Sequence, residues 1–255
     1  MTGDHPQLVG HRGYMARYPE NSWSGMRAAI DAGALWLECD IQMMNPGEFI
    51  VLHDRDLART AADPRPIFGL SGEQRQAISI HEPGRLGNRF QGEPLLRLEE
   101  LLSRLRTFPK VRIMVEIKEE SLQQWGLEAV MSPLLSILQP YRNQAVLISF
   151  SLQALQYAAS RAELELGWVL ESYTPNSLTQ ARDLAPAFLI IDHAEIPQGT
   201  VPEPGPWRWM LYDITDPEQA LAWYRRGVEL IETGDIGTLT RAFREGLGDQ
   251  GTPGK

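Results

Sequence analysis

The sequence predicts an α/β fold, a (β/α)₈ TIM barrel, and three observations carry that prediction. Short apolar, β-rich runs recur along the 255 residues, segments with helical spacing separate them, and the unit repeats about eight times. Strands that alternate with helices form a parallel sheet, and barrels of eight such units contain about 250 residues. An open doubly wound sheet is the alternative, but the chain lacks the glycine-rich nucleotide-binding fingerprints that would favour it.

The individual elements follow from the same alternation of patterns. The expected strands are Leu8–Gly10, Leu35–Ile41, Val111–Ile117, Val146–Phe150, Leu166–Leu170, Phe188–Ile191, Trp209–Tyr212 and Val228–Ile231. The expected helices between them are Asn21–Ala32, Leu98–Leu105, Leu122–Leu138, Leu152–Ala162, Ser177–Leu184 and Pro217–Arg226.

A hairpin is expected directly after the second strand. The stretch Asn45-Pro-Gly-Glu48 is turn-forming, and the connection is shorter than the dozen or so residues that a parallel crossover needs. Counting back from that turn places Met44 opposite Phe49 and His53 opposite Asp40.

A small insertion over about residues 55–94 also interrupts the barrel pattern. This segment is rich in Pro, Gly, Arg and Asp, and it has a weak helical signal around Ser71–Ile78. It is too long for an ordinary loop, so we expect a cap or an insertion over the site. Residues 1–246 are expected to form a single barrel domain, with a disordered tail at 247–255.

The charge balance and the single cysteine limit the possible functions. There are 24 Lys and Arg residues against 33 Asp and Glu residues, a net charge of −9, which argues against nucleic acid as a partner. A small anionic substrate needs only a few local cations. Because Cys39 is the single cysteine, the chain cannot form an intramolecular disulfide, which fits a reducing compartment. With no apolar run of about 18 residues and no signal-peptide pattern, we expect a cytoplasmic protein without stable membrane insertion.

Charged residues gather where the expected strands end, which is where barrel enzymes place their active sites. His11 and Arg12 follow the first strand, and Glu38 and Asp40 lie at the end of the second. Because side chains alternate along a strand, both carboxylates share one face and Cys39 lies on the other. Two carboxylates that point into a barrel repel each other unless a cation or a proton intervenes.

The third strand repeats this arrangement with Glu116 and Lys118. Carboxylate oxygens from Glu and Asp are hard ligands, suited to Mg²⁺ or Ca²⁺. Arg12 and Lys118 would supply positive charge for a phosphate, and His11 and His53 indicate a general acid and a general base.

The order of these motifs resembles that of the glycerophosphodiester phosphodiesterase family, nearly throughout the chain and most strongly up to Phe150. The matching motifs are His11-Arg-Gly-Tyr14, Pro19-Glu-Asn21, Gly33-Ala34, Glu38-Cys-Asp-Ile41, Val51-Leu-His-Asp54, Leu57-Ala-Arg-Thr60, Pro94-Leu-Leu-Arg-Leu-Glu-Glu-Leu101, Glu116-Ile-Lys118 and Ser149-Phe150.

This resemblance implies a TIM barrel that binds one divalent cation, Mg²⁺ or Ca²⁺, and hydrolyses small-molecule glycerophosphodiesters to glycerol 3-phosphate and an alcohol, within lipid and glycerol metabolism. It implies these roles by position: metal ligands Glu38, Asp40 and Glu116; acid and base His11 and His53; phosphate-binding residues Arg12 and Lys118; supporting residues Glu20 and Asn21.

The sequence departs from the family pattern in the hairpin turn and near the last two strands. The turn at Asn45–Glu48 lacks the usual Asp-Gly. Tyr212 stands where the family has Asn, and Gly234 stands where an Asp is expected. The last two changes affect head-group recognition more than the chemistry, and Trp209 or Tyr212 is expected to line the mouth.

Two rival functions and two nucleophiles stay open. A lysophospholipase D or a phospholipase C-like enzyme uses the same scaffold, and a non-catalytic phosphate- or lipid-binding relative would lack a ligand or a histidine, none of which is missing here. No Ser, Cys or Thr forms a recognisable nucleophile motif with either histidine. The attacking group is therefore expected to be a water activated by the metal or the glycerol 2-hydroxyl of the substrate.

Overall fold

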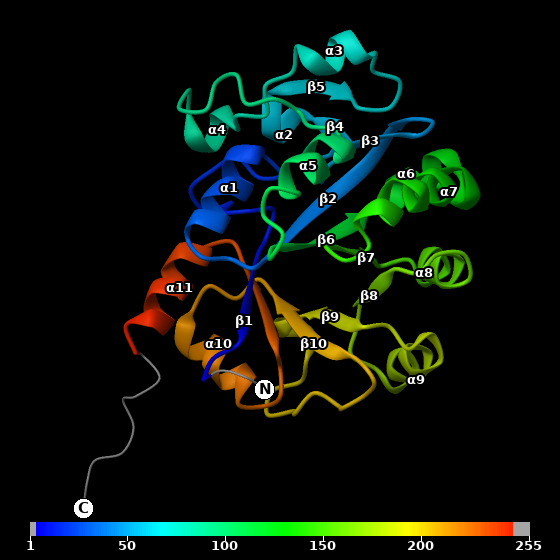
Figure 1. The fold of residues 1–255 in the computed structure, drawn as a ribbon. Helices are drawn as coiled ribbons and strands as arrows, with labels where there is room; N and C mark the ends of the chain where they lie inside the picture. The colour runs from blue at the N-terminus through cyan, green and yellow to red at the C-terminus, as the bar shows by residue number, and fades with distance from the viewer. Residues whose placement is uncertain (1–3, 247–255) are drawn as a thin grey trace, which may run out of the picture.

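The computed structural model describes residues 4–246 and contains a closed barrel of eight parallel strands (Figure 1). The strands are β1 (Gln7–Gly10), β2 (Trp36–Asn45), β6 (Arg112–Ile117), β7 (Ala145–Ser149), β8 (Glu165–Leu170), β9 (Phe188–Asp192), β10 (Arg208–Tyr212) and β11 (Leu230–Thr233). They neighbour one another in chain order, and β1 pairs with both β2 and β11, which closes the ring. The predicted barrel is confirmed.

Helices cover the outside of this barrel (Figure 1). They are α1 (Trp23–Asp31), α5 (Leu98–Leu105), α6 (Glu119–Trp125), α7 (Leu127–Leu138), α8 (Leu152–Ala159), α9 (Pro175–Leu184), α10 (Pro217–Tyr224) and α11 (Ile236–Arg244), with short 3₁₀ turns η1 (Gln139–Tyr141) and η2 (His193–Glu195). The single helix expected over Leu122–Leu138 is wrong, because Gly126 has φ +86° and separates α6 from α7. The last helix, α11, was not expected.

Two apolar layers follow from the alternation of side chains along each strand. Met114 points inward and packs with residues of other strands, such as Ile190 and Met210, inside the barrel. Its neighbours Ile113 and Val115 belong to the cluster that packs under the helices. Glu38 and Asp40 lie within β2, and Glu116 is the last residue but one of β6.

The β2–β3 hairpin forms as expected, but its predicted register is wrong by one residue. β3 (Glu48–Val51) pairs antiparallel with β2, and Met43 rather than Met44 faces Phe49. A register shift between Met43 and Asn45 places an extra residue in β2, which is how a β-bulge displaces all later pairs. As a result the backbone N–H of Leu52, not of His53, donates to the Asp40 carbonyl (3.0 Å).

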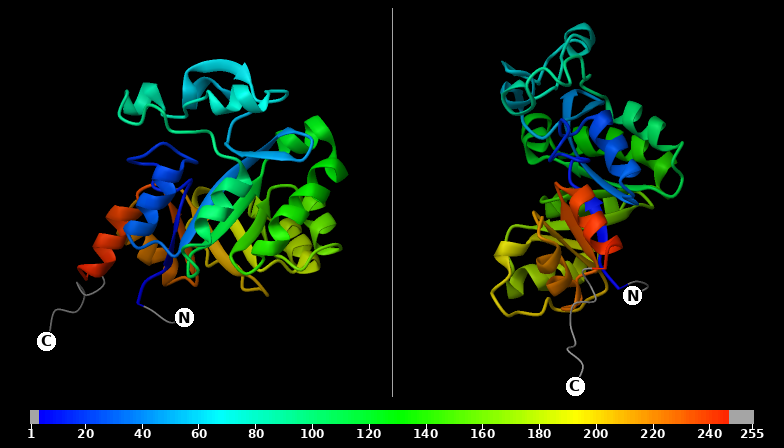
Figure 2. Two further views of the ribbon diagram at one scale, coloured as in Figure 1. Left: turned by 45° about the horizontal axis from the view of Figure 1, so that its top comes forward. Right: turned by 90° about the vertical axis from the view of Figure 1, so that its left-hand side faces the viewer.

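Short elements beyond the hairpin form a separate group (Figure 2). They are β4 (Asp56–Leu57), α2 (Ala58–Ala61), β5 (Asp63–Pro66), α3 (Gly72–Gln76) and α4 (Pro83–Leu86). The group has an apolar cluster of its own, in which Leu57, Ile67 and Ile80 meet Ile50 and Leu52 of the hairpin. Helix α3 lies within the weak helical signal noted in the sequence.

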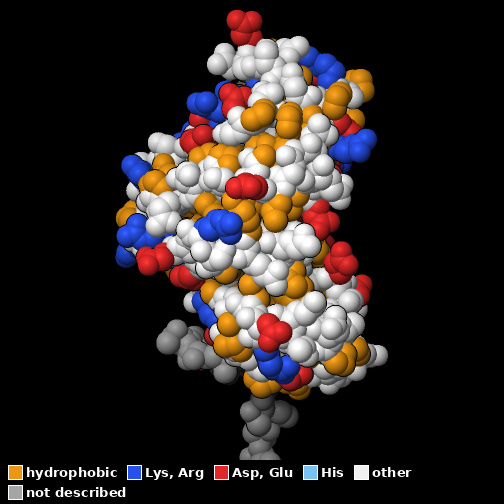
Figure 3. Space-filling model, turned by 90° about the vertical axis from the view of Figure 1, so that its right-hand side faces the viewer, with side chains coloured by type: hydrophobic (Ala, Val, Ile, Leu, Met, Phe, Trp, Pro, Cys, Tyr) orange, Lys and Arg blue, Asp and Glu red, His pale blue; other side chains and the backbone are white. Residues whose placement is uncertain are grey.

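The outer surface is mixed in character. On the face shown in Figure 3, acidic and basic side chains are interspersed among apolar and neutral ones. No described helix is long and apolar enough to cross a membrane. The expected tail at 247–255 lies outside the described residues.

Candidate active site

A cavity of about 170 Å³ lies at the carboxyl ends of the barrel strands. Nearly all of the chemistry-bearing residues expected from the sequence contribute to it. Its lining consists of His11, Arg12, Glu38, Asp40, His53, Glu116, Lys118, Ile148, Phe150, Val169, Ile190, Tyr212, Asp213 and Glu232. Five carboxylates thus share the cavity with two permanent cations and two histidines.

Asp40 is held on several sides by groups that favour its charged form. The Asn21 side-chain amide donates to Asp40 Oδ2 (2.9 Å) and accepts from the Asp40 backbone N–H (3.1 Å). Arg12 Nε lies 3.0 Å from Oδ2, and Lys118 Nζ lies 3.3 Å from Oδ1. Burial opposes ionisation, but the charges of Arg12 and Lys118 outweigh it and lower the pKa of Asp40. Asn21, at φ +54°, therefore fixes a carboxylate in the cavity.

The two neighbouring glutamates are less well compensated. Burial and the Asp40 charge raise the pKa of Glu116, although Lys118 Nζ donates to its Oε1 (2.7 Å). Burial and the Asp40 charge also raise the pKa of Glu38 well above its usual range. Glu38 Oε2 accepts from the Arg12 backbone N–H (3.0 Å), whereas its Oε1 is buried without a hydrogen-bond partner within the described chain.

This arrangement fits a divalent cation. Glu38, Asp40 and Glu116 each offer a carboxylate oxygen, and these atoms lie within 4.8 Å of one another. A bound cation would contact the unpartnered Glu38 oxygen, and its charge would offset the burial and the mutual repulsion that raise the pKa values of Glu38 and Glu116. An all-oxygen set suits a hard cation such as Mg²⁺ or Ca²⁺.

His53 belongs to a chain of hydrogen bonds that reaches back to Arg12. Its Nδ1 lies 2.6 Å from Asp54 Oδ1, and Arg59 Nε donates to Asp54 Oδ2 (2.9 Å). The Arg59 guanidinium also donates to Glu20 Oε1 (2.7 Å), which in turn accepts from Arg12 Nη1 (3.1 Å). Glu20, expected as a supporting residue, thus connects the two arginines.

His11 has a different environment. Its Nδ1 lies 3.5 Å from Asp213 Oδ1, and its Nε2 lies 3.9 Å from Glu38 Oε2. Burial lowers the pKa of His11, but the negative charges of Glu232 and Asp213 outweigh it and raise the pKa above its ordinary value. The imidazole is therefore surrounded by carboxylates.

Known proteins of one family are similar to this chain in sequence and fold. Residues 11–195 match the model of the glycerophosphoryl diester phosphodiesterase family. The chain is 30% identical over 190 residues to probable glycerophosphodiester phosphodiesterase 1 of Mycobacterium tuberculosis, covering 69% of this chain and 68% of that protein. Glycerophosphodiester phosphodiesterase 1 of Homo sapiens is 25% identical over 185 residues, covering 72% and 54%.

The chain belongs to the glycerophosphoryl diester phosphodiesterase family. The family and the enzyme class expected from the sequence are confirmed. Solved structures share the fold at low identity. A phosphodiesterase from Oleispira antarctica, in complex with the product sn-glycerol-3-phosphate, aligns with a TM-score of 0.83 and 21% identity over 94% of this chain and 97% of that one. A glycerophosphodiester phosphodiesterase from Agrobacterium tumefaciens aligns with a TM-score of 0.75 and 20% identity over 92% and 99%.

Two further residues line the cavity of this family member without having been singled out from the sequence. Glu232, on β11, is 4% exposed, and burial raises its pKa to about 7. Asp213 directly follows β10, and its backbone has φ +61°. Their position at the last two strand ends was the available signal, but an isolated acidic residue near a strand end is usually solvated.

Only one of the two residues expected at the mouth lines the cavity. Tyr212 lines the cavity, and burial raises the pKa of its phenol. Trp209 does not line it: this side chain is buried in the outer apolar layer, and its indole N–H donates to the Glu203 carbonyl (2.9 Å). Because residues alternate along β10, Met210 points into the barrel and Trp209 points toward the helices.

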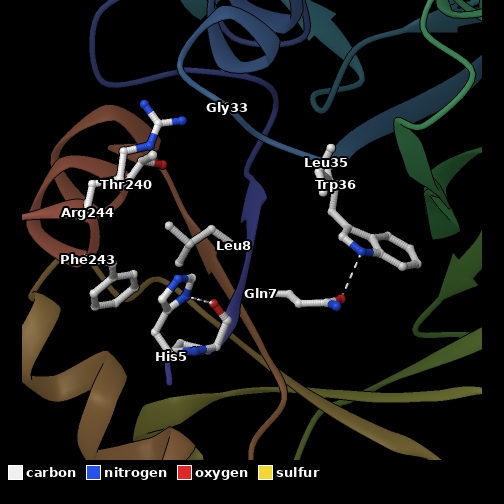
Figure 4. Close-up of a pocket in the computed structure, with 10 residues that line it drawn as sticks. His5, Gln7, Leu8, Gly33, Leu35, Trp36, Thr240, Phe243 and Arg244 are labelled. Carbon is white, nitrogen blue, oxygen red and sulfur yellow. Dashed lines mark hydrogen bonds between the residues drawn. The ribbon is translucent and has the colours of Figure 1, made fainter. Parts of the chain in front are cut away.

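A larger cavity, of about 280 Å³, lies elsewhere, between the start of β1 and α11 (Figure 4). Gln7 and Leu8 place it at the amino end of the barrel, away from the cluster of carboxylates. Its histidine, His5, stacks on Phe243 with ring centroids 4.9 Å apart. The cavity at the carboxyl ends is therefore the candidate active site of this family member.

Proposed function

We propose that the protein hydrolyses glycerophosphodiesters to glycerol 3-phosphate and an alcohol by general acid–base catalysis with two histidines. The observation that carries this proposal is the common cavity of His11, His53, Arg12 and Lys118 with three carboxylates suited to a divalent cation. A phosphodiester is a monoanion, so it fits a site that combines cationic groups with a metal-binding cluster.

Glu38, Asp40 and Glu116 would hold the cation, Mg²⁺ or Ca²⁺. When bound, such an ion offsets negative charge that develops on the phosphate oxygens during displacement. Arg12 and Lys118 add fixed positive charge beside it. Both are already paired with carboxylates, Lys118 with Glu116 and Arg12 with Glu20, and these contacts hold their charged ends at the cavity.

The two histidines would move the protons. Asp54 lies against Nδ1 of His53 and Asp213 lies near Nδ1 of His11, so in each ring we assign a proton to Nδ1 and the proton transfer to Nε2. Nε2 is free in the neutral histidine that acts as the base, and it carries a proton in the imidazolium that acts as the acid. One histidine accepts a proton from the attacking group, and the other donates a proton to the oxygen of the leaving alcohol.

We assign the attacking group to the glycerol 2-hydroxyl of the substrate. Its oxygen forms a bond to phosphorus as one histidine takes its proton. The bond from phosphorus to the alcohol oxygen then breaks, and the other histidine protonates that oxygen. Water opens the resulting cyclic phosphate with the two histidine roles reversed, which leaves glycerol 3-phosphate. A hydroxyl already held beside the phosphorus has an orientation advantage worth about 7–11 kcal/mol.

The first test is the release of glycerol 3-phosphate from glycerophosphoethanolamine, glycerophosphocholine and glycerophosphoglycerol, with and without added Mg²⁺ or Ca²⁺. We expect release that depends on the cation. Absence of glycerol 3-phosphate from all three diesters under both conditions would contradict the proposed activity.

The second test concerns the attacking group. A diester whose glycerol lacks the 2-hydroxyl should bind comparably and turn over far more slowly, and an aryl phosphodiester without a neighbouring hydroxyl should be equally poor. Rapid cleavage of the deoxy analogue would replace the cyclic route by direct attack of water.

The cell compartment follows from the same proposal. The proposed substrates and products are small and water-soluble, and their hydrolysis connects lipid breakdown with glycerol metabolism. Cys39 is buried as a free thiol, which is compatible with a reducing compartment and supports a cytoplasmic location.

A further inference from the structure

The cavity has two walls that differ in the charged groups they carry. Both permanent cations and both histidines come from the first half of the barrel and its hairpin. The second half contributes a different set to the lining: Ile148, Phe150, Val169, Ile190, Tyr212, Asp213 and Glu232. Within the described chain, this second set contains apolar, aromatic and acidic side chains and neither Lys, Arg nor His. We call Tyr212, Asp213 and Glu232 the acidic wall, and the side that carries the cations and histidines the cationic wall.

The deepest member of the acidic wall lacks a partner for one of its oxygens. Only 4% of the Glu232 surface is exposed, and its Oε1 has no hydrogen-bond partner within residues 4–246. It lies within 4.8 Å of ligand atoms of His11 and Glu38. A buried carboxylate oxygen left unpaired costs free energy. A hydrogen-bond donor or a cation that enters the cavity would recover that free energy by pairing with this oxygen.

Nearer the mouth, Tyr212 is surrounded by negative charge. It is paired in register with Asp192 of the neighbouring strand β9, and Asp213 follows it in the chain. Burial raises the pKa of its phenol most, and the charges of Asp192, Glu232 and Asp213 raise it further. An aromatic ring bordered by carboxylates is a favourable environment for an ammonium group, which interacts with both the ring face and the charges.

We propose that the acidic wall binds the ammonium group of an amino alcohol, so that the preferred substrates are glycerophosphodiesters with a positively charged head group. This inference rests on the proposed function, and it adds the chemical class of the leaving alcohol. The phosphate and the ammonium of such a diester carry opposite charges a few bonds apart. With a divalent cation held by the three carboxylates of the cationic wall, the two walls would present the complementary charges within one cavity. A neutral head group would leave the Glu232 oxygen with only hydroxyl donors, and an anionic one would meet further carboxylates.

The inference is tested by a ratio of specificities. With saturating Mg²⁺, kcat/KM is measured for glycerophosphoethanolamine and for glycerophosphoglycerol, which is neutral at the head group. We expect the ratio to favour the cationic substrate by about tenfold or more. Asp213→Asn and Glu232→Gln should each lower that ratio several-fold. Asp213 also contacts His11, but His11 serves both substrates, so the loss common to the two cancels in the ratio.

Two features keep the variants interpretable. Asp213 is 61% exposed in its side chain, and asparagine tolerates its left-handed backbone, so Asp213→Asn keeps the test valid even if Glu232→Gln misfolds. Glu218→Gln is the matched control, because Glu218 is an exposed carboxylate on α10 outside the cavity. It removes the same charge and should leave the ratio unchanged.

The outcomes separate the two proposals. Failure to hydrolyse any diester overturns the proposed function. Hydrolysis of both substrates with equal kcat/KM overturns this inference alone. The inference is also overturned if Asp213→Asn and every folded Glu232 variant lower both values equally, because the acidic wall would then act on the shared glycerol phosphate half.

Discussion

The residues behind His53 and the residues of the acidic wall differ in how firmly they are held. On the cationic wall, Asp54 is bound by His53 and Arg59, and Arg59 continues to Glu20. On the acidic wall, Asp213 contacts His11 from a largely exposed position and Glu232 keeps an unpaired oxygen. Groups tied into a network have one position before substrate arrives, which is what acid–base chemistry needs. Groups without such ties are free to be matched to a particular head group.

Removal of the divalent cation should have the largest effect, because the proposed chemistry on the cationic wall depends on it. Chelation should reduce hydrolysis to background, and added Mg²⁺ or Ca²⁺ should restore it, since the ion offsets charge worth several kcal/mol in the transition state. Glu116→Gln should weaken Mg²⁺ binding measured by calorimetry. Full activity in excess chelator would remove Glu38, Asp40 and Glu116 from the proposed ligand set.

Loss of either histidine should have the next largest effect. His11→Ala and His53→Ala should each lower kcat by about 10²–10⁴-fold, the usual contribution of a positioned acid or base, while circular dichroism and the melting temperature stay close to those of the parent. A variant that keeps the parent kcat would show its histidine to be a bystander. His81→Ala, in the insertion and away from the cavity, is the matched control.

A smaller effect should follow from loosening one ligand without removing it. Asn21→Gly deletes both side-chain contacts with Asp40 and keeps a residue that accepts φ +54°. We expect Mg²⁺ affinity to fall by about 10–100-fold, as for other groups that orient a ligand. Isothermal titration gives the affinity, with the exposed Asn143→Gly as control. An unchanged dissociation constant would mean that Arg12 and Lys118 are sufficient to position Asp40.

The smallest effect on catalysis should come from the apolar residues inside the barrel around Gly167. A Cβ at Gly167 would lie 2.8 Å from Ile148 Cγ2 and 3.0 Å from Ile190 Cδ1. Gly167→Ala should therefore lower the free energy of unfolding by about 1–3 kcal/mol through overpacking, with kcat changed little. Denaturant unfolding measures this, and Gly84→Ala, where no atom lies within 4 Å, should be nearly neutral.

The sequence predicted the barrel and the residues of the cationic wall because both follow from patterns within short stretches of the chain. Alternating strand and helix patterns place every strand end at one face, and Glu38, Asp40 and Glu116 were identified by period-2 spacing at two such ends. The hairpin register could not be predicted in the same way. A bulge near Met44 changes no hydrophobic pattern, yet it shifts all later pairs.

The acidic wall was harder to predict for a physical reason. Glu232 follows two apolar residues near the end of β11, and only the closure of β11 against β1 brings it beside His11. That contact joins two ends of the chain, so no local spacing reports it. Trp209 or Tyr212 was expected at the mouth. Tyr212 lines the cavity, whereas the place of Trp209 in the alternation directs it outward.

Several hydrogen bonds join the insertion to the loop that carries Glu20, so the two segments should open together. Glu82, in the insertion, accepts from the backbone N–H of Glu20 (2.6 Å), and Arg85 donates to the carbonyls of Met15 and Tyr18 in the same loop. Local opening of a small satellite cluster costs less free energy than global unfolding. Amide hydrogens of residues 15–21 should therefore exchange with solvent together with those of the insertion. On heating, hydrolysis should be lost while the barrel strands remain protected from exchange.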